Sequence, residues 1–167
     1  MNITICDDST RLANMLSCLQ YLRDHQLNIG LPPTAPGDLA FILAVQEHGS
    51  PVMRIPPRPV ILPALSRDSA RQAMSQAAAS ALSAAARGDL SATESALASA
   101  GQAGADAIRS YIDEGVPPPN APVTVSGGWV YNRVAAKGVP VPGKGFNKPL
   151  YDTGRLYRSF SYEIVRK

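Results

Sequence analysis

The sequence predicts a small α+β fold, in which an antiparallel β-sheet is flanked by an N-terminal helix and two alanine-rich helices. Three observations lead to this prediction. Polar and apolar residues alternate near both ends of the chain, a helical apolar spacing follows the first alternation, and residues 67–114 are rich in alanine. Because 167 residues correspond to roughly one domain, we expect a single domain over 1–167 with an extended loop at 116–148.

The N-terminal region combines a strand with a helix. Residues 2–6 alternate and include β-branched side chains, which predicts a short strand. From Arg11 onward, apolar side chains recur at a spacing of three and four, which predicts an amphipathic helix that ends near His25. Residues 28–37 contain five glycines and prolines and are therefore expected to form a loop.

An almost continuous apolar run covers residues 39–47 and includes Phe41, Ile42 and Val45, which favour strands. A run of this length also fits a short helix, but we predict a buried strand. The next residues, 48–61, contain several prolines, which lack the N–H group that a central strand needs. We expect this segment to be an extended edge or corner.

The alanine-rich part predicts two helices, over residues 67–87 and 90–114, with a break at Arg87-Gly88-Asp89. Residues 116–148 are rich in proline and glycine and show no clear element. A loop of this length in a compact domain is usually functional or ordered by a partner. The alternation at residues 155–165 predicts a closing strand.

The composition gives no sign of a membrane segment or of a disulfide framework. The chain has no apolar run of roughly 18 residues, and its first residues lack the pattern of a signal peptide, so we expect neither a membrane contact nor export. Cys6 and Cys18 have no CxxC partner and no histidine at ligand spacing. They are expected to be small buried apolar residues.

Charge is distributed unevenly along the chain. Residues 1–50 carry two basic and five acidic side chains, whereas residues 133–167 carry eight basic and two acidic ones. Such asymmetry fits a nucleic-acid-binding tail, and it equally fits docking of the acidic part of one subunit on the basic part of the next. The aromatic Trp129, Tyr131 and Phe146 leave both DNA binding and a solvated loop open as interpretations.

The sequence shows no arrangement typical of a catalytic centre. Residues 138–144 match the count of a phosphate-binding loop, but Gly145 replaces the hydroxyl residue that would hold magnesium, and two prolines remove backbone donors. The two histidines, His25 and His48, lie far apart, and no GxSxG motif is present. We therefore expect no enzyme activity, no cofactor and no metal.

Four motifs in a fixed order resemble a known family. They are Ala44-Val45-Gln46-Glu47-His48-Gly49, Ile55-Pro56-Pro57-Arg58-Pro59 followed by Val60-Ile61, the helix end Ile108-Arg109-Ser110-Tyr111-Ile112 before Gly115-Val116-Pro117-Pro118, and Lys148-Pro149-Leu150-Tyr151-Asp152-Thr153-Gly154-Arg155-Leu156 with Ser159 and Tyr162. Together they resemble the small neck and tail-completion proteins of tailed bacteriophages, of the HK97-like tail-component and virion-morphogenesis type. The resemblance covers roughly residues 39–165.

The resemblance implies a structural virion protein that forms a ring, commonly a hexamer, between the head connector and the tail tube. Its implied partners are further copies of itself, the head-completion or connector protein, and the tail tube or tail terminator protein, with non-specific contact to genomic DNA in the lumen. Its implied location is the virion neck, after assembly in the cytoplasm of the bacterial host. Subunit or ring contacts are expected at Arg54, Pro57, Arg58, Trp129, Tyr131, Asp152, Arg155 and Arg158.

Two other hypotheses remain open. A tail terminator that caps the tail tube is the first, and binding to tube protein rather than to the connector would identify it. A DNA-binding accessory protein is the second, and it would explain the basic C-terminal third. Its affinity would fall steeply with salt, because phosphate contacts release counterions.

Overall fold

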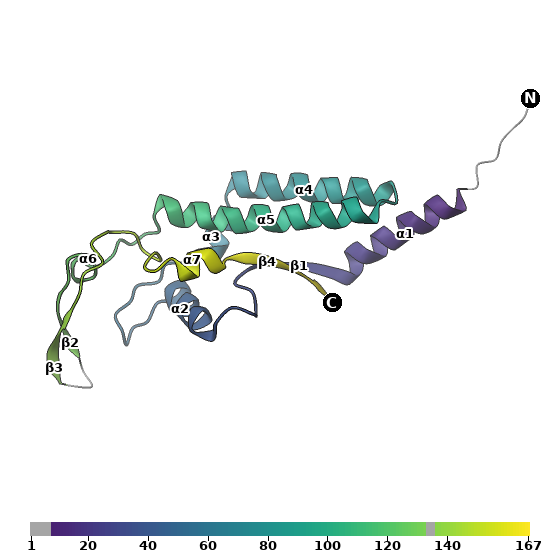
Figure 1. The fold of residues 1–167 in the computed structure, drawn as a ribbon. Helices are drawn as coiled ribbons and strands as arrows, with labels where there is room; N and C mark the ends of the chain where they lie inside the picture. Colours follow the sequence, from purple (N-terminus) through teal and green to yellow (C-terminus); the bar gives the residue numbers. More distant parts are fainter. Residues whose placement is uncertain (1–7, 133–135) are drawn as a thin grey trace, which may run out of the picture.

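The structure is a computed structural model that describes residues 8–132 and 136–167. The strand predicted at residues 2–6, which includes Cys6, therefore lies outside the described residues. The described part confirms the α+β class, with seven helices and two antiparallel sheets of two strands each. The molecule is elongated, with helix α1 projecting at one end and the β2–β3 hairpin at the other (Figure 1).

Helix α1 (Ser9–Asp24) confirms the predicted amphipathic helix, and Cys18 is buried on its inner face as expected. Strand β1 (His25–Gly30) follows directly and pairs antiparallel with β4 (Ser161–Arg166). The loop predicted at residues 28–37 is thus wrong for its first three residues. The pairing joins segments at opposite ends of the chain, and a local sequence pattern cannot predict such a long-range contact.

The alanine-rich segment folds into α4 (Asp68–Ala86) and α5 (Leu90–Glu114), which confirms both predicted helices. The Asp89 carboxylate accepts a hydrogen bond of 2.9 Å from the Ala92 N–H and so caps α5. The side chains buried between the two helices are mostly alanines, so the helix axes approach closely. These alanines are Ala81, Ala84, Ala85, Ala100 and Ala105.

Helix α5 also packs on the β1–β4 ribbon through two glycines. A Cβ atom on Gly101 would overlap the ring of Tyr162, and one on Gly104 would lie 2.6 Å from the Cδ1 atom of Ile29. The absence of side chains on this face therefore lets the ribbon lie directly against the helix.

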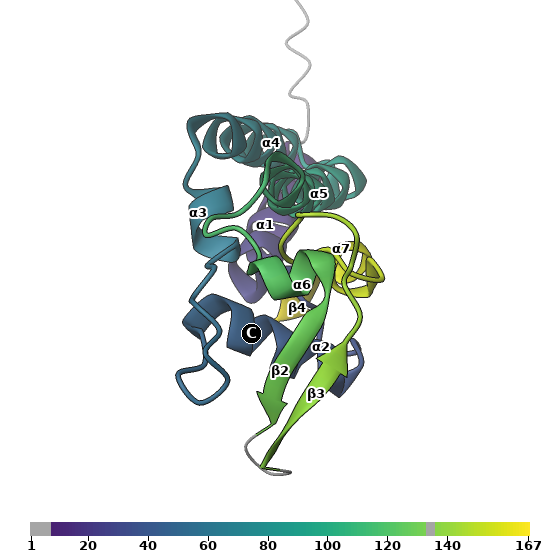
Figure 2. The same cartoon turned by 90° about the vertical axis from the view of Figure 1, so that its left-hand side faces the viewer.

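The elements form three layers (Figures 1 and 2). Helices α4 and α5 make the first layer, and the β1–β4 ribbon, α3 (Ile61–Leu65) and α7 (Arg155–Ser159) make the second. Helix α2 (Gly37–His48) makes the third. The hydrophobic core lies where these layers meet, and its buried members are Leu39, Leu43, Val60, Ala64, Ile108, Ile112, Val116, Leu156 and Phe160.

Helix α2 corrects the strand predicted at residues 39–47. Leu39 and Leu43 are buried while Phe41 is exposed, so the buried positions are four residues apart, as on one face of a helix. The continuous apolar run is explained by apolar residues on the outer face of α2. The corner predicted at 48–61 consists of a turn closed by the Ser50–Ile55 bridge, followed by irregular backbone as far as Val60.

Two further corrections concern the C-terminal third. The segment 116–148, predicted as a loop without elements, contains α6 (Pro122–Ser126) and a hairpin of β2 (Gly128–Asn132) and β3 (Lys137–Val141). The strand predicted at residues 155–165 begins only at Ser161, because α7 precedes it. Among the helices in the described part of the chain, none has the length and apolar character needed to cross a membrane.

Candidate interaction site

Three of the four motifs of the sequence resemblance meet at Arg58, whose side chain is only 6% exposed. Its Nε atom donates a hydrogen bond of 2.7 Å to the carbonyl of Pro118, and its Nη2 atom donates one of 3.0 Å to the carbonyl of Pro119. Burial lowers the pKa of the guanidinium from its ordinary value. Arg58 thus links the proline-rich corner to the segment that leaves α5.

Helix α2 is tied to the same corner through its last turn. The backbone N–H of Arg58 donates a hydrogen bond of 2.6 Å to the carbonyl of Gln46. The Oε1 atom of Glu47 accepts hydrogen bonds from the N–H groups of Val60 (2.9 Å) and Ile61 (3.0 Å), at the start of α3. The Glu47 carboxylate therefore satisfies backbone donors that the start of a helix leaves open.

The C-terminal motif is held by carboxylates on other elements. Asp113 at the end of α5 accepts hydrogen bonds from Lys148 Nζ and Tyr157 Oη, both 2.7 Å long. The hydrogen bond from Lys148, and next that from Tyr157, lowers the pKa of Asp113. Arg155 forms an ion pair of 3.0 Å with Asp38 at the start of α2. These contacts join distant segments of one chain.

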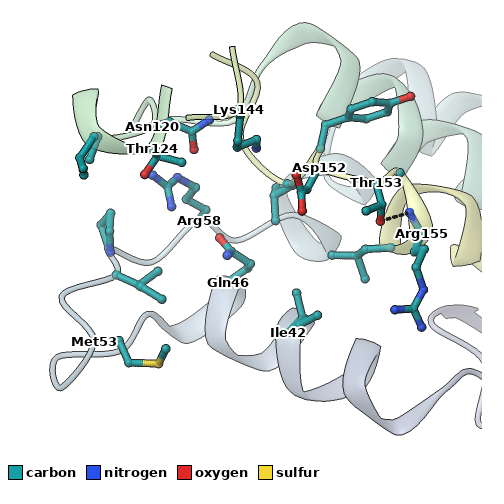
Figure 3. A pocket seen from close by; sticks show the side chains of 18 of the residues that line it. Ile42, Gln46, Met53, Arg58, Asn120, Thr124, Lys144, Asp152, Thr153 and Arg155 are labelled. Atoms are coloured by element: carbon teal, nitrogen blue, oxygen red, sulfur yellow. Dashed lines mark hydrogen bonds between the residues drawn. The ribbon is translucent and has the colours of Figure 1, made fainter. Parts of the chain in front are cut away.

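A cleft of about 620 Å³ opens beside Arg58, between α2, the 53–58 corner, α6 and the 150–156 turn (Figure 3). Its polar lining includes Gln46, Asn120, Lys144 and Asp152. Burial lowers the pKa of Lys144, with a second lowering contribution from the charge of Arg58, whereas Asp152 acts to raise it. Arg58 and Lys144 therefore share a partly dehydrated part of the cleft with the Asp152 carboxylate.

Two polar atoms at this cleft lack partners. The Oε1 atom of Gln46 and the Nδ2 atom of Asn120 are buried and make no hydrogen bond within the described part of the chain. Buried polar atoms are normally satisfied by protein, water or a bound group. The cleft therefore offers one unused acceptor and one unused donor close to Arg58.

The predicted contact residues fall into three groups. Trp129 and Tyr131 are 74% and 65% exposed on the β2–β3 hairpin, as an interface requires. Exposed side chains near the cleft form the second group, which consists of Arg54, Pro57 and Asp152. The third group makes its contacts within the chain: Arg58 as described above, Arg155 with Asp38, and Arg158 with the carbonyl of Thr153 at 3.0 Å.

Part of the apolar face predicted for the N-terminal helix is exposed in the structure. Leu12, Leu16 and Leu19 follow the predicted three-and-four spacing, but they are 52%, 48% and 42% exposed, whereas Cys18 is the buried residue of α1. The spacing therefore predicted the helix correctly, but it did not show that these three leucines lack a partner surface within the described part of the chain. We call Leu12, Leu16 and Leu19 the α1 stripe.

Two basic side chains of the C-terminal third are paired with carboxylates within the chain, Lys148 with Asp113 and Arg155 with Asp38. Lys144 Nζ and Lys167 Nζ donate instead to neutral backbone carbonyls, that of Lys148 at 3.2 Å and that of Arg23 at 3.1 Å, and so keep their charge. Residues 115–151 nevertheless contain four cations and no carboxylate. The hairpin end thus keeps a positive character.

Within residues 8–132 and 136–167, no group of three or more His, Cys, Asp and Glu side chains is placed to hold a metal ion. Cys18, the cysteine in this part of the chain, is free. Comparison with protein families, with curated proteins and with solved structures finds no match for this chain.

Proposed function

We propose that this protein is a structural subunit of the neck of a tailed bacteriophage, which forms a ring between the head connector and the tail. The observation that carries the proposal is the presence of two exposed apolar surfaces at opposite ends of an elongated chain (Figure 1). One is the α1 stripe, Leu12, Leu16 and Leu19. The other is the hairpin surface, Trp129 and Tyr131, which lie two positions apart on strand β2 and so on the same face of it.

Unpaired strand edges also favour a role in assembly. Each of the two sheets in the described part of the chain has only two strands, so its outer edges have no strand partner. Aromatic side chains such as Trp129 and Tyr131 are typical of the centres of protein interfaces.

The placement of the two surfaces favours a head-to-tail contact between copies. When one end of a subunit binds the opposite end of the next, the result is a closed ring if the rotation closes. We infer that the α1 stripe of one subunit docks on the hairpin surface of its neighbour. The motifs around Arg58 then serve as a rigid centre that fixes the angle between the two ends.

Two complementary variants test this arrangement. Leu16→Asp places a charge in the α1 stripe, and Trp129→Asp places one in the hairpin surface, so each variant retains one functional end. We expect both variants to be monomeric alone and to form a one-to-one dimer when mixed, measured by light scattering. Leu62→Asp is the control, because Leu62 is 74% exposed but belongs to neither surface.

Mixing that produces no dimer, while the unmodified chain still forms a ring, would contradict the head-to-tail contact. The ring hypothesis itself is contradicted if the unmodified chain stays monomeric, both alone and with connector and tail-tube proteins. Binding to connector protein favours the neck role, and binding only to tube protein favours a tail terminator. These outcomes separate the two phage functions.

A DNA-binding accessory protein is the second candidate. The carboxylate-free stretch at residues 115–151 and the exposed aromatics of the hairpin favour it. The discriminating measurement is the affinity for duplex DNA as a function of salt. A monomer whose affinity falls steeply with salt would support this candidate over the ring.

A further inference from the structure

Arg58 carries a buried positive charge without a negative partner. None of the ion pairs in the described part of the chain includes Arg58, and two of its three guanidinium nitrogens donate to neutral carbonyls. Buried arginines are normally paired, because moving a charge out of water is costly unless an opposite charge compensates it. The side chain lines the cleft, so a counter-charge has access to it.

Two more donors face the same space. Lys144 lines the cleft and lies close enough to Arg58 for the two like charges to affect each other. Asn120 directly follows Pro119, whose carbonyl binds Arg58, and its buried Nδ2 atom has no partner in the described residues. Figure 3 shows the Asn120 and Lys144 side chains above the Arg58 guanidinium.

We propose that the cleft is a binding site for an oxyanion, a carboxylate or a phosphate group, held by Arg58, Lys144 and Asn120. An anion there would neutralise the buried guanidinium and accept hydrogen bonds from Asn120 and Lys144. The unpartnered acceptor of Gln46 suits an O–H or N–H group next to the anion, such as the hydroxyl of hydrogen phosphate.

The charges that line the cleft also favour an anion. Arg54 and Asp152 also line the cleft, and Arg155 at its edge is already paired with Asp38. Asp152 is the one acidic side chain in the lining, against four basic ones. The cleft therefore keeps a net positive charge that an anion reduces.

The first test follows the midpoint of thermal unfolding in inorganic phosphate and in acetate, with chloride at equal ionic strength as reference. A ligand at ten times its Kd raises Tm by roughly 3–6 °C for a chain of this size. We expect this rise in the unmodified chain and its loss in Lys144→Gln. Lys137→Gln removes the same charge from β3 outside the cleft lining and should keep the response.

The second test supplies the missing charge from the chain itself. In Asn120→Asp a carboxylate of the same shape replaces the amide with its unpartnered donor. We expect this variant to melt at a higher temperature than the unmodified chain in chloride and to lose its response to phosphate. A lower melting temperature together with a retained phosphate response would overturn the proposal.

Self-association distinguishes the two sources of the anion. If an acidic side chain of another copy fills the cleft, phosphate competes with it and dissociates the assembly. If a free anion fills it, the assembly persists in phosphate while Tm rises. Equal Tm shifts in the unmodified chain, Lys144→Gln and Asn120→Asp, or no shift in any, would contradict the site. Because Tm is also measurable for a monomer, this result does not depend on the proposed ring.

Discussion

At the scale of single residues, the guanidinium of Arg58 donates to two consecutive carbonyls that lie 60 and 61 positions further along the chain. The sequence marked Arg58 as important, since it stands in the Ile55–Pro59 motif. The sequence did not reveal that it faces inward, because its carbonyl partners come from a distant segment. Its role as a link within the chain follows from tertiary structure alone.

Replacing Arg58 by alanine should therefore destabilise the chain. Arg58→Ala removes two charge-assisted hydrogen bonds and leaves a cavity, and we expect a loss of about 2–4 kcal/mol in the free energy of unfolding. Urea denaturation measures this loss. Arg54→Ala is the matched control, because Arg54 is exposed and its loss should change stability by less than about 0.5 kcal/mol. Equal stability of the two variants would refute this role.

A second prediction at this scale concerns acid. The hydrogen bond from Lys148 lowers the pKa of Asp113 in the folded chain below its value in the unfolded chain. This contribution to stability is present above the ordinary aspartate pKa of about 4 and is lost as pH falls through the lowered value. Asp113→Asn should make stability less dependent on pH in this range.

The control for this prediction is Glu94→Gln, which removes an exposed carboxylate elsewhere on α5. Urea denaturation at several pH values between about 2 and 6 covers the range in which the carboxylate is titrated. A pH dependence that is the same in Asp113→Asn as in the unmodified chain would show that the Lys148 and Tyr157 contacts contribute nothing to acid stability.

At the scale of elements, local patterns predicted α1, α4 and α5, because a helix is specified by the spacing of residues within one segment. They failed for β1, whose partner β4 lies at the other end of the chain. They also failed for α2, since nine mostly apolar residues fit a strand and a helix equally well. They also failed for the β2–β3 hairpin, because the prolines and glycines in and around its strands are typical of loops.

The contact between α5 and the β1–β4 ribbon gives a prediction for an element. Gly101→Ala would push a methyl group into the ring of Tyr162, so we expect a loss of about 1–3 kcal/mol in the free energy of unfolding. Gly37→Ala at the start of α2 is the control, because nothing lies within 4 Å of the added carbon. Equal free energies of unfolding for Gly101→Ala and the control would contradict the close packing of the β1–β4 ribbon on α5.

At the scale of the whole molecule, the sequence predicted the α+β class but not the arrangement of the two ends. The charge asymmetry suggested complementary subunit faces. In the structure, Arg155 and Asp38 already pair within one chain. We therefore base the proposed assembly on the α1 stripe and the hairpin surface, whose elements lie at opposite ends of the molecule (Figure 1).

The most direct test of this account is the mass of the unmodified chain in solution. We would measure it by sedimentation over a range of concentrations, together with negative-stain imaging, alone and after addition of connector protein. The account predicts a closed ring, formed by the chain alone or on the connector. A chain that remains monomeric under every one of these conditions would contradict it.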